Sequence, residues 1–217
     1  MEISLLFEDD DMIAVDKPDG IASIPERTPD QTDLLFRLTE QRGAPLWVVH
    51  RLDKEVSGVI LFAKTAAMHR LLNDQFQKKK IDKTYIAIVH GRVAADHGVI
   101  DKAIRACGSG RMAVDEQRGK PSQTRFHVLA RTLQTSRLEV HPQTGRRHQI
   151  RVHLYSIGHP LVGDPRYGDK QRNLGFPRLY LHAHSIRFQN PHSGQEIRIT
   201  SPLPDAFDLV CSNKEVR

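Results

Sequence analysis

The sequence has 217 residues, 39% of them hydrophobic and 27% charged, which is the balance of a globular protein and argues against disorder as the main state. The formal net charge of +6 and the isoelectric point near 9.5 favour a polyanionic partner, although charge alone favours RNA only modestly. Cys107 and Cys211 are far apart and form no CxxC motif, so neither a disulfide framework nor a cysteine zinc site is supported.

The amino-terminal segment is not a signal peptide, because it lacks a positive start and an apolar core and soon reaches acidic residues at 8–11. Apolar runs such as residues 58–63 are too short to cross a bilayer. We therefore expect a soluble protein that is not exported, has no membrane partner and works in the reducing cytoplasm.

The first elements in the chain are predicted to be a β-hairpin. Two short apolar runs, residues 3–7 and 12–15, are separated by acidic residues and lead into a turn at residues 17–20.

Two helices are predicted next. Thr32 can cap the first, which ends near Gly43, and Thr65 can cap the second. Lysines at residues 78–80 follow the second helix, where a helix end favours cations; a solvated helix end and an RNA contact explain them equally well. Apolar residues recur at helical spacing in both segments: Leu34, Leu35 and Leu38 in the first, and Met68, Leu71, Leu72 and Phe76 in the second.

The chain becomes rich in strand-forming residues from Tyr85 onward. Residues 107–120 contain many Gly, Arg and Lys residues and predict a mobile basic loop. A helix is expected after Gly145, ending at Gly158. We expect one α+β domain over residues 1–217, with a mixed, largely antiparallel sheet flanked by helices. The predicted strands are residues 85–89, 123–128, 137–140, 179–188 and 196–199.

Asp53 is the first candidate for chemistry. It ends the run His50-Arg51-Leu52-Asp53 and precedes Ser57-Gly58, so its carboxylate stands between a cation and a glycine turn. From the residues alone, a structural role, in which Asp53 caps a turn or pairs with Arg51, is the stronger interpretation.

Six segments together resemble the RluA-type family of RNA pseudouridine synthases. The resemblance lies in their order and spacing and covers nearly the whole chain. It implies a bilobed fold with a central active cleft, and an enzyme that isomerises specific uridines to pseudouridine in structured rRNA or tRNA without a cofactor. Because the first predicted strands already belong to the catalytic domain of this family, we expect no S4 domain before them. The segments are residues 15–20, 50–58, 83–85, 144–153, 159–164 and 181–183.

The resemblance implies three catalytic residues. Asp53 would either attack the anomeric carbon of the ribose or remove the neighbouring 2′ proton, and the sequence leaves both roles open. Arg151 would contact this aspartate, favour its ionised form and fix its direction. Tyr85 would stack on the uracil and keep its hydroxyl available for proton transfer, although a strand tyrosine is more often a packing residue.

Four further residues are expected to bind the substrate. Arg51 would enter the space left by the extruded uridine, whose extrusion costs roughly a few kcal/mol. Arg146 and Arg147 follow Gly145 at the predicted helix start, where phosphate contact is favoured over simple solvent exposure. Leu181 would form an apolar wall beneath the base, and core packing explains it equally well.

The expected partners are stem-loops of rRNA or tRNA, recognised mainly by shape, and the protein is expected to be a monomer. A non-catalytic RNA-binding or ribosome-assembly protein of the same fold is the alternative, but it would not need Asp53, Tyr85 and Arg151 together. A metal-dependent hydrolase using His182 and His184 is a more distant alternative, because chance pairs are expected among 12 histidines. No acidic residue completes an HExxH motif with His148 and His153 either, and we predict no metal site.

Overall fold

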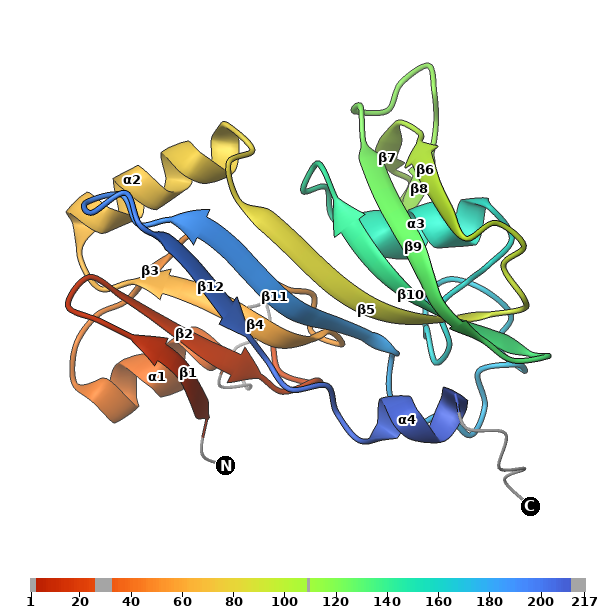
Figure 1. Cartoon of the computed structure of the whole chain (residues 1–217), viewed down its shortest axis with the longest axis horizontal. Helices are drawn as coiled ribbons and strands as arrows, with labels where there is room; N and C mark the ends of the chain where they lie inside the picture. Colours follow the sequence, from red (N-terminus) through yellow and green to blue (C-terminus); the bar gives the residue numbers. More distant parts are fainter. Residues whose placement is uncertain (1–2, 26–32, 109, 212–217) are drawn as a thin grey trace. The chain divides into compact units, whose positions relative to one another are not determined.

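The computed structural model describes residues 3–25, 33–108 and 110–211, and it divides into two compact units (Figure 1). The first unit comprises Met1–Lys83 and Ala183–Pro202, and the second comprises Thr84–His182 and Leu203–Arg217. Both units are built on antiparallel strand pairs with a few helices, which confirms the α+β class and the largely antiparallel sheet. The prediction that residues 1–217 act as a single domain stays a prediction.

In the first unit, the predicted hairpin of two strands is confirmed and continues into a larger sheet. The strand order is β1-β2-β4-β11, with β12 paired to β11 and β3 paired to β4. Gly58 in β4 has a φ of 112°, and a side chain there would collide with the backbone of Ala183, so only glycine fits. The strands are β1 (Ser4–Glu8), β2 (Met12–Lys17), β3 (Trp47–Val48), β4 (Ser57–Ala63), β11 (Leu181–Gln189) and β12 (Glu196–Thr200).

Helix α1 (Leu34–Arg42) is confirmed, and it ends at Gly43 as predicted, where the glycine adopts the left-handed conformation. Its cap is Asp33, whose side chain accepts a hydrogen bond from the backbone of Phe36 at 3.0 Å. Thr32, the cap that we predicted, lies outside the described residues.

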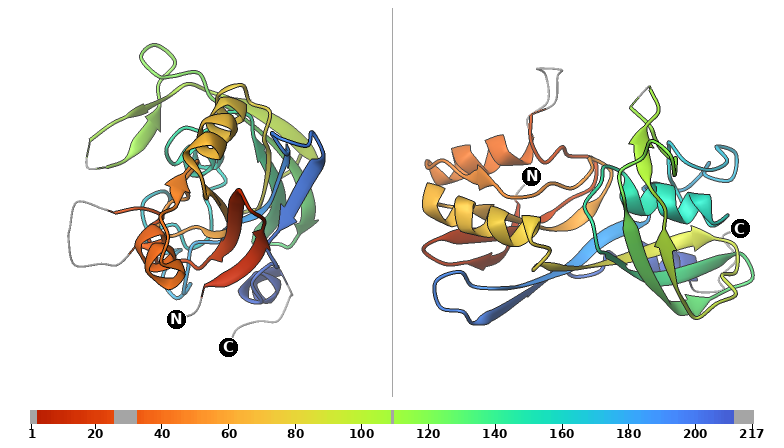
Figure 2. Two further views of the ribbon diagram at one scale, coloured as in Figure 1. Left: turned by 90° about the vertical axis from the view of Figure 1, so that its left-hand side faces the viewer. Right: turned by 90° about the horizontal axis from the view of Figure 1, so that it is seen from above.

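Helix α2 (Ala66–Gln77) begins as predicted, because the Thr65 hydroxyl accepts a hydrogen bond from the backbone of Met68 at 3.1 Å. Met68 and Leu72 are fully buried against residues of β2 and β4, whereas Leu71 is exposed. Figure 2 shows α1 and α2 on the same face of the first unit's sheet. Within the described part of the chain, no helix is long and apolar enough to cross a membrane.

The second unit has the strand order β5-β10-β9-β6 and a separate two-stranded hairpin, β7-β8. The five predicted strands, in both units, are confirmed with small differences at their ends, whereas β3, β4, β6, β7 and β8 were not predicted. The strands of this unit are β5 (Asp82–His90), β6 (His97–Asp101), β7 (Ile104–Ala106), β8 (Met112–Val114), β9 (Gln123–Arg131) and β10 (Thr135–Pro142).

The prediction that residues 107–120 form only a mobile loop is wrong, because β8 lies inside this segment and Lys120 pairs with Ile104. Met112 and Val114 pack against a small cluster of Ile104, Val152 and Tyr167. Two apolar side chains among charged neighbours give no periodic signal, so only their tertiary partners reveal the hairpin.

Two helices cover opposite faces of the second unit's sheet. On β5, Ile86 and Ile88 cluster with Phe207 of α4 (Ala206–Cys211), a helix that was not predicted. On the other face, His153 of α3 (Gln149–Ser156) bonds the hydroxyl of Thr124 in β9 at 2.8 Å. Helix α3 ends close to Gly158, as predicted, but it begins at Gln149 rather than directly after Gly145.

Candidate active site

Asp53 lies between β3 and β4, in a segment that the first unit fixes through its backbone. Ser23 is buried, and its hydroxyl donates to the carbonyl of Leu52 at 2.8 Å and accepts from its amide at 3.1 Å. The carbonyl of Asp53 accepts the turn bond from Val56 at 3.1 Å. Asp53 is partly exposed, whereas Arg51 is exposed. These backbone contacts fix the segment that carries the Asp53 side chain.

Lys17 is the second anchor of this segment. Its side chain is completely buried, and its ammonium group donates to the carbonyls of Pro18, Ile21 and Lys54 at 2.9, 2.8 and 3.1 Å. Three carbonyl acceptors compensate the loss of water around a buried cation. Lys54 directly follows Asp53, so Lys17 ties the amino-terminal turn to the candidate catalytic segment. The sequence placed Lys17 in one of the family-like segments but assigned it no role.

His50 is held as a neutral, structural residue. Its Nε2 atom accepts a hydrogen bond from the backbone of Leu61 at 3.0 Å, and its ring stacks on Phe76 with centroids 5.0 Å apart. Burial, and to a lesser extent the charge of Lys83, lowers the pKa of His50 to about 3. Burial also lowers the pKa of Lys83. His50 is therefore uncharged near neutral pH and supports the segment rather than moving protons.

Tyr85 lies in β5 of the second unit, opposite Val140 of β10. It has intermediate exposure, whereas Ile86 and Ala87 beside it are buried. A partly exposed ring at this position is compatible with stacking on a base as well as with packing.

Arg151 is completely buried in α3, and the structure gives it a carboxylate partner that we did not predict. Its Nε and Nη2 atoms donate to Oδ2 and Oδ1 of Asp164 at 2.9 and 2.7 Å. The guanidinium also lies over the ring of Tyr167, 5.3 Å from its centroid. Asp53 and Arg151 belong to different units, and the contact between them stays a prediction.

The turn after Asp164 links Arg151 to the β7-β8 hairpin. Oδ1 of Asp164 accepts hydrogen bonds from the backbone of Arg166 at 2.8 Å and of Tyr167 at 3.1 Å. The hydroxyl of Tyr167 then contacts Nδ1 of His148 at 2.7 Å and the amide of Met112 at 2.9 Å. The hairpin, the turn and the start of α3 thus form one hydrogen-bonded group.

Arg146 and Arg147 are exposed and lie in the turn before α3, which corrects the prediction that they stand at the helix start. The backbone amide of Arg146 donates to the side chain of Gln149 at 3.0 Å, so this donor is already used inside the protein. A contact of Arg146 with phosphate would therefore come from its guanidinium group.

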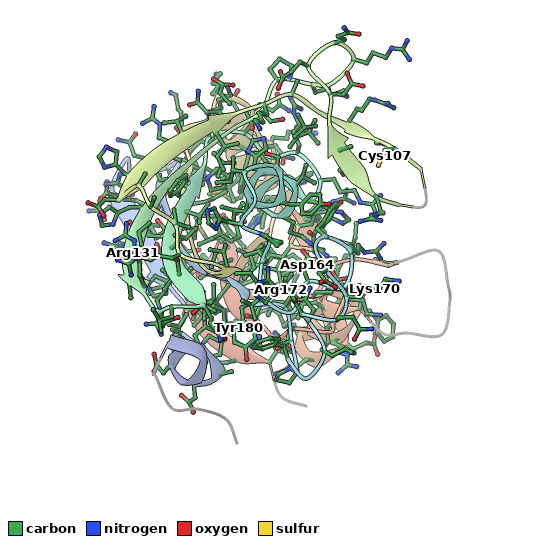
Figure 3. All side chains as sticks on the ribbon, turned by 90° about the vertical axis from the view of Figure 1, so that its right-hand side faces the viewer. Cys107, Arg131, Asp164, Lys170, Arg172 and Tyr180 are labelled. Carbon is green, nitrogen blue, oxygen red and sulfur yellow. The ribbon has the colours of Figure 1, made fainter. Side chains whose placement is uncertain are left out.

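The same part of the second unit presents several other cations. Nitrogen atoms of Arg147 and Arg166 lie close to Gly110, and the guanidinium of Arg111 lies over the ring of Tyr167 at 5.5 Å and donates to the carbonyl of Arg166. Lys170 and Arg172 are exposed on the segment that follows Asp164 (Figure 3). This surface suits a polyanion.

Leu181, His182 and His184 lie in β11. Leu181 is 3% exposed at the start of β11. The ring of His182 packs edge-on against Phe207, and Nδ1 of His184 contacts the carbonyl of Ser201 at 3.0 Å. Among the described residues, His, Cys, Asp and Glu form no group of three or more that could hold a metal ion.

Comparison with known proteins identifies the family. A model described as RNA pseudouridylate synthase matches residues 11–156. The dual-specificity RNA pseudouridine synthase RluA of Vibrio vulnificus is 38% identical, and the alignment covers 96% of this chain and 87% of that protein. The ribosomal large subunit pseudouridine synthase C of Haemophilus ducreyi is also 38% identical over 94% of this chain, but this chain spans only 66% of its length.

The solved structures agree with the sequence relatives. Human RNA pseudouridylate synthase domain containing 1 superposes with a TM-score of 0.81 at 26% identity, covering 94% of this chain and 84% of that one. The matched residues 11–156 include Asp53, Tyr85 and Arg151. The chain belongs to the RluA type of the RNA pseudouridine synthase family, whose members are enzymes that isomerise uridine to pseudouridine in RNA.

Proposed function

We propose that this protein isomerises one or a few uridines in structured rRNA or tRNA. The observation that carries the proposal is the family match over residues 11–156, which runs through both units and contains the three expected catalytic residues. The Haemophilus ducreyi relative is named as an enzyme of the large ribosomal subunit and the Vibrio vulnificus relative as a dual-specificity enzyme, so large-subunit rRNA is the first substrate to test. A purely RNA-binding role is disfavoured because the related proteins are named as enzymes.

We propose Asp53 as the catalytic carboxylate, acting either as nucleophile at the anomeric carbon or as base at the 2′ position. Both roles need a carboxylate that is held in a fixed position. The anchoring of its neighbours by Ser23 and Lys17 meets this need.

Arg151 and Tyr85 are proposed to assist Asp53. A guanidinium has five N–H donors, so it can serve Asp164 and a second carboxylate at the same time. Tyr85 is proposed to stack on the detached uracil and to pass a proton through its hydroxyl. No cofactor or metal is needed for this chemistry, because the bond that breaks and the bond that forms lie within one nucleotide.

Substrate binding is proposed to involve Arg51 in the space of the extruded base, Leu181 beneath the base, and Arg146 and Arg147 on phosphates. Their exposed guanidinium groups support this assignment for the arginines. We further propose that the two units work as one domain in a monomeric protein, since the family match crosses from one unit to the other.

The test is conversion of unmodified large-subunit rRNA and total tRNA by the purified protein, followed by mapping of pseudouridine. Release of tritium from carbon 5 of labelled uridine gives the rate. Asp53→Asn should abolish turnover and leave RNA affinity nearly unchanged, because the amide has the same shape but cannot act as nucleophile or base.

The matched control is Glu55→Gln, which removes a carboxylate two residues away and should keep the wild-type rate. If Asp53→Asn retained activity within about tenfold of wild type, a difference of only ~1.4 kcal/mol in the barrier, Asp53 would not be the catalytic group. No pseudouridine in any of the RNAs would favour the binding-protein alternative.

A further inference from the structure

Asp164 holds Arg151 in one orientation. Both side chains are completely buried, and the carboxylate accepts hydrogen bonds from Nε and Nη2 of the guanidinium at 2.9 and 2.7 Å. Two parallel hydrogen bonds fix both the direction and the plane of a guanidinium, which a single bond does not. The ring of Tyr167 covers the same guanidinium at 5.3 Å, so rotation out of this plane would also lose a cation–π contact.

Asp164 is itself rigidly held. Its Oδ1 atom accepts hydrogen bonds from the backbone amides of Arg166 and Tyr167. Its backbone carbonyl accepts a hydrogen bond from the side-chain amide of Asn173 at 3.0 Å. The side-chain oxygen of Asn173 also accepts a hydrogen bond from the backbone amide of Gly163 at 2.8 Å. Asn173 therefore holds the backbone before and after the Asp164 side chain. The carboxylate is therefore a fixed reference point within the second unit.

Stability alone is a weak explanation for this pair. Removing two charged groups from water costs about as much free energy as their attraction returns, so buried ion pairs contribute little to folding compared with apolar residues of similar size. What such a pair does provide is a defined geometry. The geometry here is imposed on the arginine that the proposed mechanism places beside the catalytic carboxylate.

We propose that Asp164 is a positioning residue for the isomerisation: it aims the guanidinium of Arg151 and so controls the rate without contacting the RNA. The inference rests on the proposed function of Arg151. The sequence did not suggest it, because Asp164 stands 13 residues from Arg151 and no local pattern connects them.

Asp164→Asn separates the two tasks of this carboxylate. The amide oxygen can still accept the backbone bonds of Arg166 and Tyr167 that Oδ1 accepts now, so the turn is preserved. The amide nitrogen would replace Oδ2 and place a donor against Nε of Arg151, which is also a donor. The substitution thus disturbs the arginine rather than the turn.

The experiment measures single-turnover rates at saturating enzyme, RNA dissociation constants and thermal unfolding for wild type and variants. We expect Asp164→Asn to lower the single-turnover rate about 10- to 100-fold, as for a misplacement of about 1 Å, with RNA affinity changed by no more than about twofold. Asp164→Glu keeps the charge but moves it by one methylene group, and it should recover part of the rate. Should the Asn variant not fold, a wild-type rate in folded Asp164→Glu would overturn the inference by itself.

The decisive readout is a double-mutant cycle with Arg151→Ala. If Asp164 acts through Arg151, the double variant should be no slower than Arg151→Ala alone, because nothing remains to be aimed. Additive losses would overturn the inference. Val162→Ala is the matched control, since it removes a buried side chain two residues away, and it should lower thermal stability while its folded fraction keeps the wild-type rate.

Failure of the proposed function would look different. A fully active Arg151→Ala would remove Arg151 from the mechanism and the reason for positioning it. An inactive Arg151→Ala together with a fully active, folded Asp164→Asn would overturn only the positioning role.

Discussion

Lys17 allows the anchoring of the segment around Asp53 to be tested by one substitution, Lys17→Met. Methionine has a similar length and keeps the apolar stem but removes the ammonium group, which donates to the carbonyls of Pro18, Ile21 and Lys54. The carbonyl of Lys54 keeps a second bond, from the amide of Gly20 at 2.9 Å. The carbonyls of Pro18 and Ile21 lose the ammonium.

The expected cost follows from this difference. Leaving a backbone carbonyl without its charged donor costs about 1 to 3 kcal/mol, so two carbonyls cost about 2 to 6 kcal/mol. Relief from burying a cation offsets part of this, and we expect a net loss of about 2 to 4 kcal/mol in the free energy of unfolding. With a urea m-value of about 2 to 3 kcal/mol/M, the unfolding midpoint should fall by about 1 to 2 M.

The assay is urea unfolding followed by tryptophan fluorescence. Trp47 is the one tryptophan in the sequence, and it packs against the core of the first unit, so its emission reports on the unit that contains Lys17. At low urea, where the variant is folded, the isomerisation rate should also fall about 10- to 100-fold, because the segment of Asp53 has lost one anchor.

Lys64→Met provides the matched control. Lys64 is also a lysine of the first unit with polar partners, but its side chain is 22% exposed and pairs with Glu8 at 3.0 Å. An ion pair of this kind contributes about 0 to 1 kcal/mol, so its midpoint should change little. A wild-type midpoint and rate in Lys17→Met would refute the anchoring role.

Three other predictions concern pH, salt and the proposed pair of Asp53 and Arg151. The pKa of His50 is about 3 in the folded state and about 6.5 in the unfolded state, so the unfolded state binds more protons below pH 6.5. The free energy of unfolding, measured by chemical denaturation, should therefore fall by about 2 kcal/mol from pH 7 to pH 5, and it should fall less in His50→Gln. Replacing Arg146 and Arg147 by alanine should flatten the slope of log affinity for RNA against log salt by about 1 to 2 units, and an unchanged slope would place them outside the RNA footprint. Arg151→Lys should lower the isomerisation rate, as Arg151→Ala does. The double variant Asp53→Asn with Arg151→Ala should be hardly slower than Asp53→Asn alone, and additive losses would contradict a direct partnership of the two residues.

Local elements of this protein could be read from its sequence because their causes lie within a few residues. Thr65 caps α2 through the third residue after it, and acidic residues between two apolar runs produce the β1-β2 hairpin. The sequence also singled out Asp53 through the collinear motifs that identify the family, and the family is confirmed. The helix start at Gln149 was missed, since His148 begins α3 with a positive φ and no side-chain cap, a conformation that histidine rarely adopts.

Only the tertiary structure decided which hydrogen-bond partners the buried charged side chains have. Lys17 reaches the carbonyl of Lys54, 37 residues away, and Arg151 reaches Asp164 across 13 residues. The choice of partner for a buried polar group depends on where burial removes water and on which acceptor lies within hydrogen-bonding distance, and neither quantity is encoded in residue spacing. The sequence by itself determined the elements with strong local signals and the candidate catalytic residue. The fold determined how Asp53 and Arg151 are held, because anchoring is a property of non-local contacts.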